Sequence, residues 1–528
     1  MKHFNIIFKP DDKQISIHAG ATLLEAAGQA GIILNTVCGG KGTCEKCVVN
    51  LEPDSQRVLA CQYHIQSDIT VTIPPGSRFF EQKILAEGID TKGKIRPDIY
   101  EKYLEPGSAA PIFGVAIDIG TTTIVARLID MKDGRCLATQ AELNPQSRYG
   151  DDVISRISYA ETDAKLAELH EKIINCVNEL IVRLCRQVGI DSKQIYEVTV
   201  VGNTTMNHIF LKFPITQLGQ APYRAFSLDA KDTPASELAL QINPAGNIHT
   251  APNIAGFVGS DTTAVALAVD IDSAEEMTLA VDIGTNGELV LGTGDKLYAA
   301  SCAAGPALEG ARITCGSRAA EGAIEAVVAG EDDIVLDVIG DCPPRSICGS
   351  GLIDAVAVLL NLGIVDASGR FVKASTLADS VPVVIASRIR TEIGEPVFIL
   401  TASGAAETVF LTQKDIRQVQ LAKAAIRAGI KLLQKKVGIT DAEVQRIFLA
   451  GAFGNYIRAE SALRIGLLPA VPAERIHFVG NAASAGAQMI LLSRHCREKA
   501  KELARKIEYV EIAHEPDFQA VFADCMSF

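Results

Sequence analysis

Apolar and polar residues alternate near the start of the chain. Residues 4–8 and 15–17 place apolar side chains at every second position, which predicts two strands of a hairpin. Residues 22–30 have the apolar spacing of a helix, and residues 69–73 return to a strand pattern. Together these elements predict a small unit of strands and one helix over residues 1–76.

A different pattern occurs twice in the rest of the chain. The apolar strand at 114–119 ends in Asp-Ile-Gly-Thr and is followed by a strand at 124–129. The strand at 279–283 also ends in Asp-Ile-Gly-Thr and is followed by a strand at 289–291. Both segments predict two buried strands joined by a tight turn.

A second pattern also occurs twice, in the same order. A helix predicted over 165–187 ends in Val-Gly-Ile, and the strand at 196–201 runs into Gly-Asn. A helix over 415–436 ends in Val-Gly-Ile, and the strand at 446–450 runs into a glycine-rich loop. Chance similarity of apolar strands is the alternative, but it would not preserve the order of the elements. We expect two similar half-domains that face each other.

Composition agrees with a protein of several α/β domains. The chain has 528 residues, of which 48% are hydrophobic and 43 are glycine. A polar stretch of mixed charge predicts a linker over 77–111, with room for one short helix, that lets the first unit move. We expect the first half-domain over 112–275 and the second, with the nucleotide site, over 276–528.

Charge and cysteine content exclude several classes of function. The net charge of −13 argues against a general nucleic-acid or membrane-surface binder, and no apolar run is long enough to span a membrane. The N-terminus lacks the features of a signal peptide, so 13 cysteines indicate a reducing cytoplasm. The basic run at 494–499, interrupted by Glu498, predicts a solvated helix face.

Four cysteines form the most informative cluster of the sequence. Cys38, Cys44 and Cys47 are separated by gaps of five and two residues, and Cys61 follows after a gap of thirteen. Such spacing is typical of iron–sulfur or zinc sites. Three glycines between the first two cysteines let the backbone curl around a bulky group, which favours a [2Fe–2S] cluster. A zinc knuckle and plain buried thiols are the alternatives.

The two Asp-Ile-Gly-Thr segments have the groups that a phosphate chain requires. Glycines permit the tight turns, threonine hydroxyls lie beside free N–H groups, and Asp118 and Asp282 can hold Mg²⁺ directly or through water. The predicted phosphate-loop residues are Gly120, Thr121, Thr122, Gly284, Thr285 and Gly287. Gly451 and Gly454 follow a later strand and would lie flat against a base or ribose.

These motifs carry a resemblance that extends over nearly the whole chain. The cysteine segment resembles adrenodoxin-like members of the β-grasp ferredoxins. The three loops, on duplicated ribonuclease-H-like halves, resemble the superfamily of actin, sugar kinases and large heat-shock chaperones. Their combination resembles the reductive activators of corrinoid-dependent enzymes, as do residues 301–310 and 346–351.

The resemblance implies an α/β protein in which a β-grasp ferredoxin domain precedes an actin-like ATPase. Its activity would be ATP-dependent transfer of one electron from a [2Fe–2S] cluster to Co(II) corrinoid, regenerating Co(I) for methyl transfer. The four cysteines would bind the cluster, Asp118 and Asp282 would manage Mg²⁺ and the attacking water, and Asn286 would join the phosphate ligands. The implied partners are a corrinoid protein of a methyltransferase system and a low-potential electron donor.

Some questions stay open from the sequence. An electron activator for a partner without cobalt, and a redox sensor with a vestigial ATPase fold, are the alternative functions. Glu309 is a candidate near the nucleotide, with a salt bridge in the core as its alternative. The sequence does not decide which Asp is catalytic, which corrinoid protein is served, or whether the chain forms a homodimer.

Overall fold

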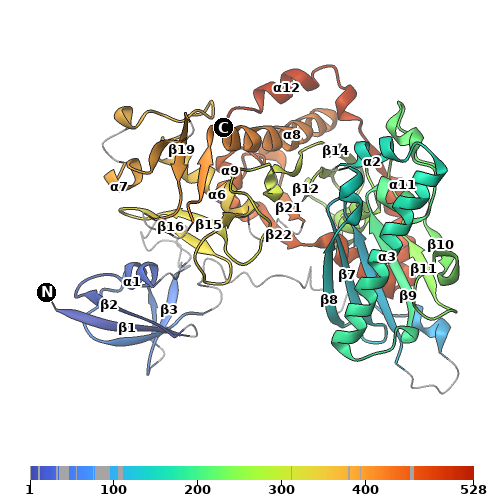
Figure 1. Cartoon of the computed structure of the whole chain (residues 1–528), viewed down its shortest axis with the longest axis horizontal. Helices are drawn as coiled ribbons and strands as arrows, with labels where there is room; N and C mark the ends of the chain where they lie inside the picture. The colour runs from blue at the N-terminus through green and yellow to red at the C-terminus, as the bar shows by residue number, and fades with distance from the viewer. Residues whose placement is uncertain are drawn as a thin grey trace. The chain divides into compact units, whose positions relative to one another are not determined.

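The computed structural model is drawn in Figure 1. It describes residues 2–9, 12–30, 32, 34, 47–54, 56–74, 77, 95–104, 111–150, 152–310, 312–377, 381–392, 394–402, 405, 407–451 and 457–528. The chain divides into two compact units. Unit 1 holds Met1–Leu85, Gly310–Ile416 and Tyr456–Arg458, and unit 2 holds Ala86–Glu309, Arg417–Asn455 and Ala459–Phe528.

The N-terminal part of unit 1 is a five-stranded sheet with strand order β2-β1-β5-β3-β4. Its elements are β1 (His3–Lys9), β2 (Lys13–His18), α1 (Leu23–Gln29), β3 (Val48–Leu51), β4 (Gln56–Leu59) and β5 (Ile69–Thr72). The alternation predicted for β1 points Phe4, Ile6 and Phe8 into one core, where α1 also packs. The hairpin, helix and later strand predicted from the sequence are confirmed.

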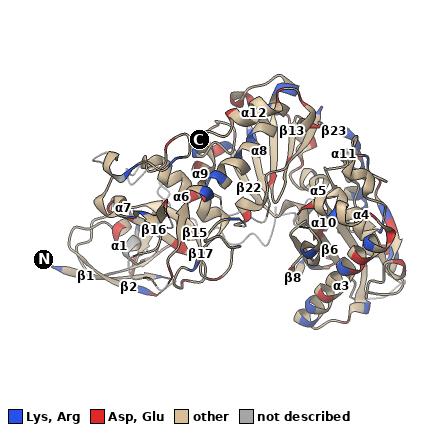
Figure 2. Cartoon of the chain, turned by 45° about the horizontal axis from the view of Figure 1, so that its top comes forward, with Lys and Arg blue, Asp and Glu red and all other residues tan. Residues whose placement is uncertain are grey.

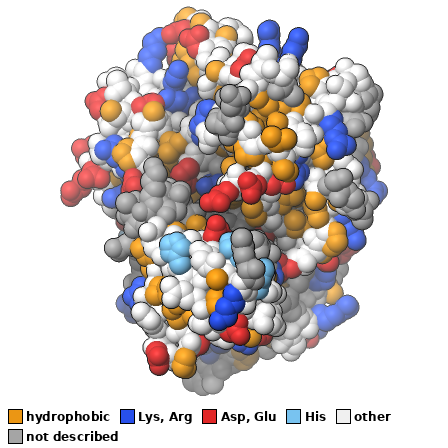
Figure 3. All heavy atoms as spheres, turned by 90° about the vertical axis from the view of Figure 1, so that its left-hand side faces the viewer, with side chains coloured by type: hydrophobic (Ala, Val, Ile, Leu, Met, Phe, Trp, Pro, Cys, Tyr) orange, Lys and Arg blue, Asp and Glu red, His pale blue; other side chains and the backbone are white. Residues whose placement is uncertain are grey.

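The remainder of unit 1 contains two three-stranded sheets. The first has β15 (Ala323–Ala329), β16 (Ile334–Val338) and β17 (Ser346–Ile347), and the second has β18 (Ile389–Glu392), β19 (Glu395–Ile399) and β20 (Phe410–Thr412). Helix α6 (Gly349–Asn361) packs on β15, and a Cβ at Gly351 would lie 2.3 Å from the Ile324 carbonyl oxygen. The face drawn in Figure 3 exposes hydrophobic side chains among charged ones.

Unit 2 is built around two six-stranded sheets. The first has the order β10-β11-β9-β6-β7-β8, and the second has the order β22-β21-β12-β13-β14-β23. The strands of the first are β6 (Phe113–Ile119), β7 (Thr123–Asp130), β8 (Cys136–Leu143), β9 (Ile195–Gly202), β10 (Lys231–Pro234) and β11 (Asn247–Thr250). Those of the second are β12 (Thr278–Ile283), β13 (Gly287–Gly292), β14 (Leu297–Cys302), β21 (Arg446–Ala450), β22 (Ile476–Gly480) and β23 (Ile507–Tyr509).

The two sheets share one topology. In each, the strand that ends in Asp-Ile pairs antiparallel with the next strand and parallel with a later one: β6 with β7 and β9, and β12 with β13 and β21. A third meander strand follows on one side, β8 or β14, and a parallel strand on the other, β11 or β22. The predicted duplication of ribonuclease-H-like halves is therefore confirmed.

Three helices share one hydrophobic core with both sheets. They are α5 (Ser260–Ala268), α10 (Ala482–Leu492) and α11 (Arg494–Lys506). On the opposite face of the first sheet lies α3 (Asp163–Val188), whose apolar stripe is buried while its outer surface carries acidic and basic residues (Figure 2). Helix α8 (Gln413–Val437) packs on the second sheet, where its Gly429 approaches Leu289 and Cys302. Among the described helices, none has the length and apolar character needed to cross a bilayer.

Two polar segments make buried contacts that their composition does not reveal. Residues 95–104, inside the predicted linker, pack on unit 2 through the fully buried Ile99 and the 3-10 helix Ile99–Tyr103. The sequence did not predict this contact, because its apolar residues are scattered through a polar stretch. The basic run on α11 is not a purely solvated face either, since Arg497 forms an ion pair with buried Glu197 and Lys499 pairs with Asp270.

The close contact between α5 and α10 gives a test of the shared core. A Cβ at Gly486 would lie 2.1 Å from the Ala264 carbonyl oxygen, so Gly486→Ala must push the helices apart. We expect it to lower the free energy of unfolding of unit 2 by about 2–3 kcal/mol in urea titrations followed by circular dichroism.

Gly189→Ala is the control, because Gly189 ends α3 at φ +77° with open space around it. Backbone strain alone would cost this variant about 1–2 kcal/mol. Equal stability of Gly486→Ala and the wild type would contradict the close packing.

Candidate functional site

The two predicted phosphate loops meet in unit 2. The hydroxyls of Thr122 and Thr285 lie 2.7 Å apart, which joins the turn after β6 to the turn after β12. The Asn203 amide, at the end of β9, donates to the Thr121 hydroxyl at 2.9 Å. Thr285 also donates to Glu309 at 3.2 Å, so Glu309 lies beside the second loop.

Glycines make these turns possible at the points where the chain approaches itself. A Cβ at Gly120 would lie 2.7 Å from the Thr123 carbonyl oxygen, closer than any real Cβ. Gly451 has φ +106°, and a Cβ there would lie 3.0 Å from Asp282 Oδ1. The third predicted loop therefore begins beside the second. Gly454 lies outside the described residues.

Four acidic side chains gather where the strands end. Asp118 ends β6 and Asp282 ends β12, while Asp261 lies in the first turn of α5 and Glu288 on β13. Each is half-buried. The sequence analysis found the first two and missed Asp261 and Glu288. Asp261 follows a Gly-Ser pair at the start of a helix, and Glu288 follows the second loop directly, but only the fold brings them to the same place.

Burial and mutual repulsion raise the pKa values of this cluster. Burial raises the pKa of Asp118 well above its usual range, and the charges of Asp261 and Asp282 raise it further. Burial, and then Asp261, raise the pKa of Asp282 to about 7. Burial, and then the charges of Asp261 and Asp282, raise the pKa of Glu288. The Asn481 amide opposes this by hydrogen bonding to Asp118. The acidic cluster therefore favours either protons or a bound cation.

The donor set suits a hydrated divalent cation that accompanies phosphates. Within the described residues, no three acidic, histidine or cysteine side chains converge closely enough to hold a metal ion by themselves. Mg²⁺ commonly keeps several waters and binds one or two carboxylates together with phosphate oxygens. Carboxylates around two hydroxyl-lined loops fit that mode, and the loops supply the hydroxyls and N–H groups that phosphates require.

Two of the four predicted cluster cysteines lie within the described residues. Cys47 and Cys61 are buried, and their sulfur atoms lie 3.4 Å apart. Two thiolates on one tetrahedral metal would be about 3.8 Å apart, for metal–sulfur bonds of about 2.3 Å. The two sulfur atoms are therefore adjacent and slightly closer than two ligands of one metal ion would be. Cys38 and Cys44 lie outside the described residues.

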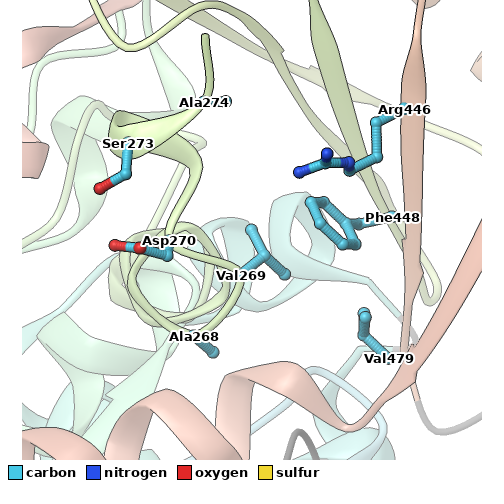
Figure 4. Close-up of a pocket in the computed structure, with 8 residues that line it drawn as sticks. All are labelled: Ala268, Val269, Asp270, Ser273, Ala274, Arg446, Phe448 and Val479. Carbon is cyan, nitrogen blue, oxygen red and sulfur yellow. The ribbon is translucent and has the colours of Figure 1, made fainter. Parts of the chain in front are cut away.

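A cavity of about 340 Å³ lies beside the second sheet (Figure 4). It is lined by the end of α5, by Arg446 and Phe448 of β21, and by Val479 of β22. Val479 precedes Gly480, which pairs with Ala450, and Ala450 pairs with Asp282, so the cavity extends along the strands from Arg446 toward the acidic cluster. Its lining residues are distinct from those of the two loops.

Family models match three segments of the chain. The model described as "C-terminal domain of RACo the ASKHA domain" matches residues 276–528, and "RACo middle region" matches residues 113–274. A "2Fe-2S iron-sulfur cluster binding domain" matches residues 5–74. The segments correspond to the second sheet, the first sheet and the N-terminal sheet.

Two of the relatives match over nearly the full length. The corrinoid activation enzyme RamQ of Eubacterium limosum is 35% identical over 97% of this chain and 97% of its own. The chain belongs to the family of corrinoid-activating enzymes. A solved structure of a reductive activator for corrinoid, iron-sulfur protein matches this activator with TM-score 0.75 and 32% identity, over 99% of this chain and 98% of its own. A [Co(II) methylated amine-specific corrinoid protein] reductase of Methanosarcina barkeri is 27% identical over 75% of the activator and 73% of its own length.

The raised pKa of Asp282 predicts a pH dependence of stability in EDTA. The folded state binds the proton more tightly than the unfolded state, so this contribution is full below about pH 4 and is lost as the pH rises through about 7. Asp282→Asn removes the charge. We expect the variant to match the wild type at pH 4 and to be more stable by about 1–2 kcal/mol at pH 8, since partial exposure of Asp282 to water weakens the effect.

Urea unfolding of the activator at both pH values measures this difference. The control is Asp229→Asn, an exposed carboxylate in the same unit, which should leave the pH profile unchanged. A constant difference between Asp282→Asn and wild type from pH 4 to pH 8 would show that Asp282 has an ordinary pKa.

Proposed function

We propose that this activator uses ATP to drive one electron from a [2Fe–2S] cluster to the Co(II) form of a corrinoid protein, which restores Co(I). The observation that carries the proposal is the combination, in one chain, of a paired cysteine site with two facing phosphate loops and an acidic cluster. Full-length relatives named as corrinoid activation enzymes support the acceptor. We place the reaction in the cytoplasm, with a low-potential donor as the electron source.

Each group of residues has a distinct role in this proposal. Cys38, Cys44, Cys47 and Cys61 hold the cluster, which supplies one-electron transfer when bound. The phosphates are bound by the two loops, through Gly120, Thr121, Thr122, Gly284, Thr285, Asn286 and Gly287. The adenosine is bordered by Gly451 and Gly454. Asp118 and Asp282 would hold Mg²⁺, directly or through water, and orient the attacking water, with Asp261 and Glu288 adding to the negative field.

The need for ATP follows from the energy of the electron. For one electron, each 59 mV uphill costs a factor of ten, or about 1.4 kcal/mol. An illustrative gap of roughly 300 mV would leave about one electron in 10⁵ on cobalt. Binding of the nucleotide phosphates between the loops draws the two sheets together, and only a difference in affinity between open and closed states can supply the work.

The electron activator of a non-cobalt enzyme would use the same ATPase. The RamQ relative, which matches over 97% of both chains, favours the cobalt acceptor. The redox-sensor alternative is disfavoured by the intact acidic cluster and phosphate loops, since a vestigial site would have no reason to retain four mutually repelling carboxylates.

Two variants separate electron transfer from ATP chemistry. Protein reduced chemically and freed of reductant is mixed anaerobically with a corrinoid iron–sulfur protein in its Co(II) state, and Co(I) absorbance is followed with and without Mg-ATP. We expect Co(I) only with ATP. Cys61→Ser should form none yet hydrolyse ATP at the wild-type rate. Asp282→Asn should keep the cluster spectrum and lose ATP turnover by about 100-fold or more.

Cys136→Ser is the matched control for the cysteine change, because Cys136 lies on β8, far along the chain from the ferredoxin-type sheet. It should behave as wild type. Formation of Co(I) by Cys61→Ser would exclude the cluster as the donor. A reduced cluster and rapid ATP turnover without any Co(I), across several corrinoid proteins, would move the proposal to a different acceptor.

A further inference from the structure

Residues 95–104, which lead from the ferredoxin-type domain into unit 2, are attached at three places. The first is Asp98. Its carboxylate accepts a hydrogen bond from the Arg494 N–H at 2.8 Å, and its own N–H donates to the Leu492 carbonyl at 3.0 Å. Asp98 thus caps α11 from outside the helix. The second place is Ile99, which is buried in the core shared by both sheets.

The third place is Glu197 on β9, whose side chain is fully buried. Lys102 lies 2.8 Å from one of its oxygens, and the Tyr103 hydroxyl donates to the same oxygen. Arg497 and Asn247 each donate to the other oxygen at 2.7 Å. Burial alone would raise the pKa of Glu197, but Arg497 and Lys102 hold it below its usual range. The carboxylate is therefore a charged junction for three segments.

The elements that hold this segment also reach the phosphate loops. Strand β9 runs from Glu197 to Gly202, and Asn203 directly after it donates to Thr121 of the first loop. Helix α10 is capped by Asn481, which hydrogen-bonds Asp118, and its last residue Leu492 accepts from Asp98. One strand and one helix therefore each have one end at the nucleotide loops and the other at residues 95–104.

We propose that Glu197 is a positioning residue for electron delivery. Together with the Asp98 cap it anchors residues 95–104, from which the ferredoxin-type domain is tethered. Through β9 and α10 it also makes the position of these residues depend on whether nucleotide is bound at the two loops. This inference rests on the proposed function. It assigns residues 95–104 to the ATPase machinery instead of to a passive spacer, and it concerns residues that touch neither the nucleotide nor the cluster.

Hydrogen exchange tests the attachment directly. Amides of residues 95–104 are followed in the full-length protein with and without a non-hydrolysable Mg-ATP analogue. In wild type we expect the nucleotide to change their exchange rates at least fivefold. Glu197→Gln keeps the shape of the side chain and removes its charge. It should speed their exchange at least tenfold and abolish the response to nucleotide.

Co(II) reduction tests the functional consequence. The Co(II) corrinoid iron–sulfur protein is the probe, and the number of Co(I) formed per ATP hydrolysed is measured. Glu197→Gln should lower this ratio at least fivefold, with ATP turnover within twofold of wild type and an unchanged cluster spectrum. A purely structural defect would reduce ATP turnover in parallel. Tyr103→Phe removes a single hydroxyl and should give the same pattern in weaker form, which keeps the test decisive if Glu197→Gln does not fold.

Lys165→Gln is the matched control, because it breaks the exposed ion pair with Glu161 in the same unit. It should leave every readout unchanged. Faster exchange at 95–104 with a wild-type ratio of Co(I) to ATP would overturn the positioning role, and unchanged exchange in both variants would overturn the attachment. If wild type forms no Co(I) at all, the proposed function fails, and the exchange experiment alone then decides whether Glu197 links these residues to the phosphate loops.

Discussion

The main constraint on unit 2 is that its fold must hold several carboxylates close together against their mutual repulsion. Asp118, Asp261, Asp282 and Glu288 lie half-buried where the strands of two sheets end, and each raises the cost of ionising another. Nothing local would stabilise such an arrangement. It exists because the two sheets are held on a common core, so the repulsion is offset by apolar burial elsewhere. A hydrated cation with phosphates would relieve this repulsion, in keeping with the proposed nucleotide site.

The common core has a second consequence. Helices α5 and α10 approach so closely at Gly486 that no side chain fits between them, and close-packed elements move as bodies instead of deforming. Asn481 at one end of α10 and Asp98 beside the other end place hydrogen bonds at both limits of the same helix. A change at the phosphate loops therefore has a rigid route to the opposite side of the unit. The cavity beside Arg446 and Phe448 leaves unfilled space next to the segment that connects α5 to β12.

Division of the chain into two units separates the two kinds of chemistry. The cysteine pair lies in a small sheet with its own core, and the acidic cluster lies in unit 2. In the proposed function, partner binding and the segment that joins the two sites couple them, which is the reason the buried contacts of residues 95–104 matter.

Much of this organisation follows from the sequence. Apolar spacing determined the N-terminal hairpin, α3, α8 and the strand before each loop, since periodicity reflects burial directly. The repeated Asp-Ile-Gly-Thr segments indicated paired phosphate loops, because only glycine permits the turn at Gly120. The spacing of the four cysteines favoured a cluster, and the fold brings Cys47 and Cys61 side by side.

The tertiary structure decided the rest. Asp261 and Glu288 look like ordinary polar positions until α5 and β13 are placed beside the loops. Arg497 belongs to a run typical of a solvated face, and Ile99 to a stretch typical of a linker, yet Arg497 is half-buried and Ile99 is buried. Their partners, Glu197 and the shared core, are distant in sequence. Local patterns record which residues avoid water, whereas the pairing of charges across elements depends on which surfaces the fold brings into contact.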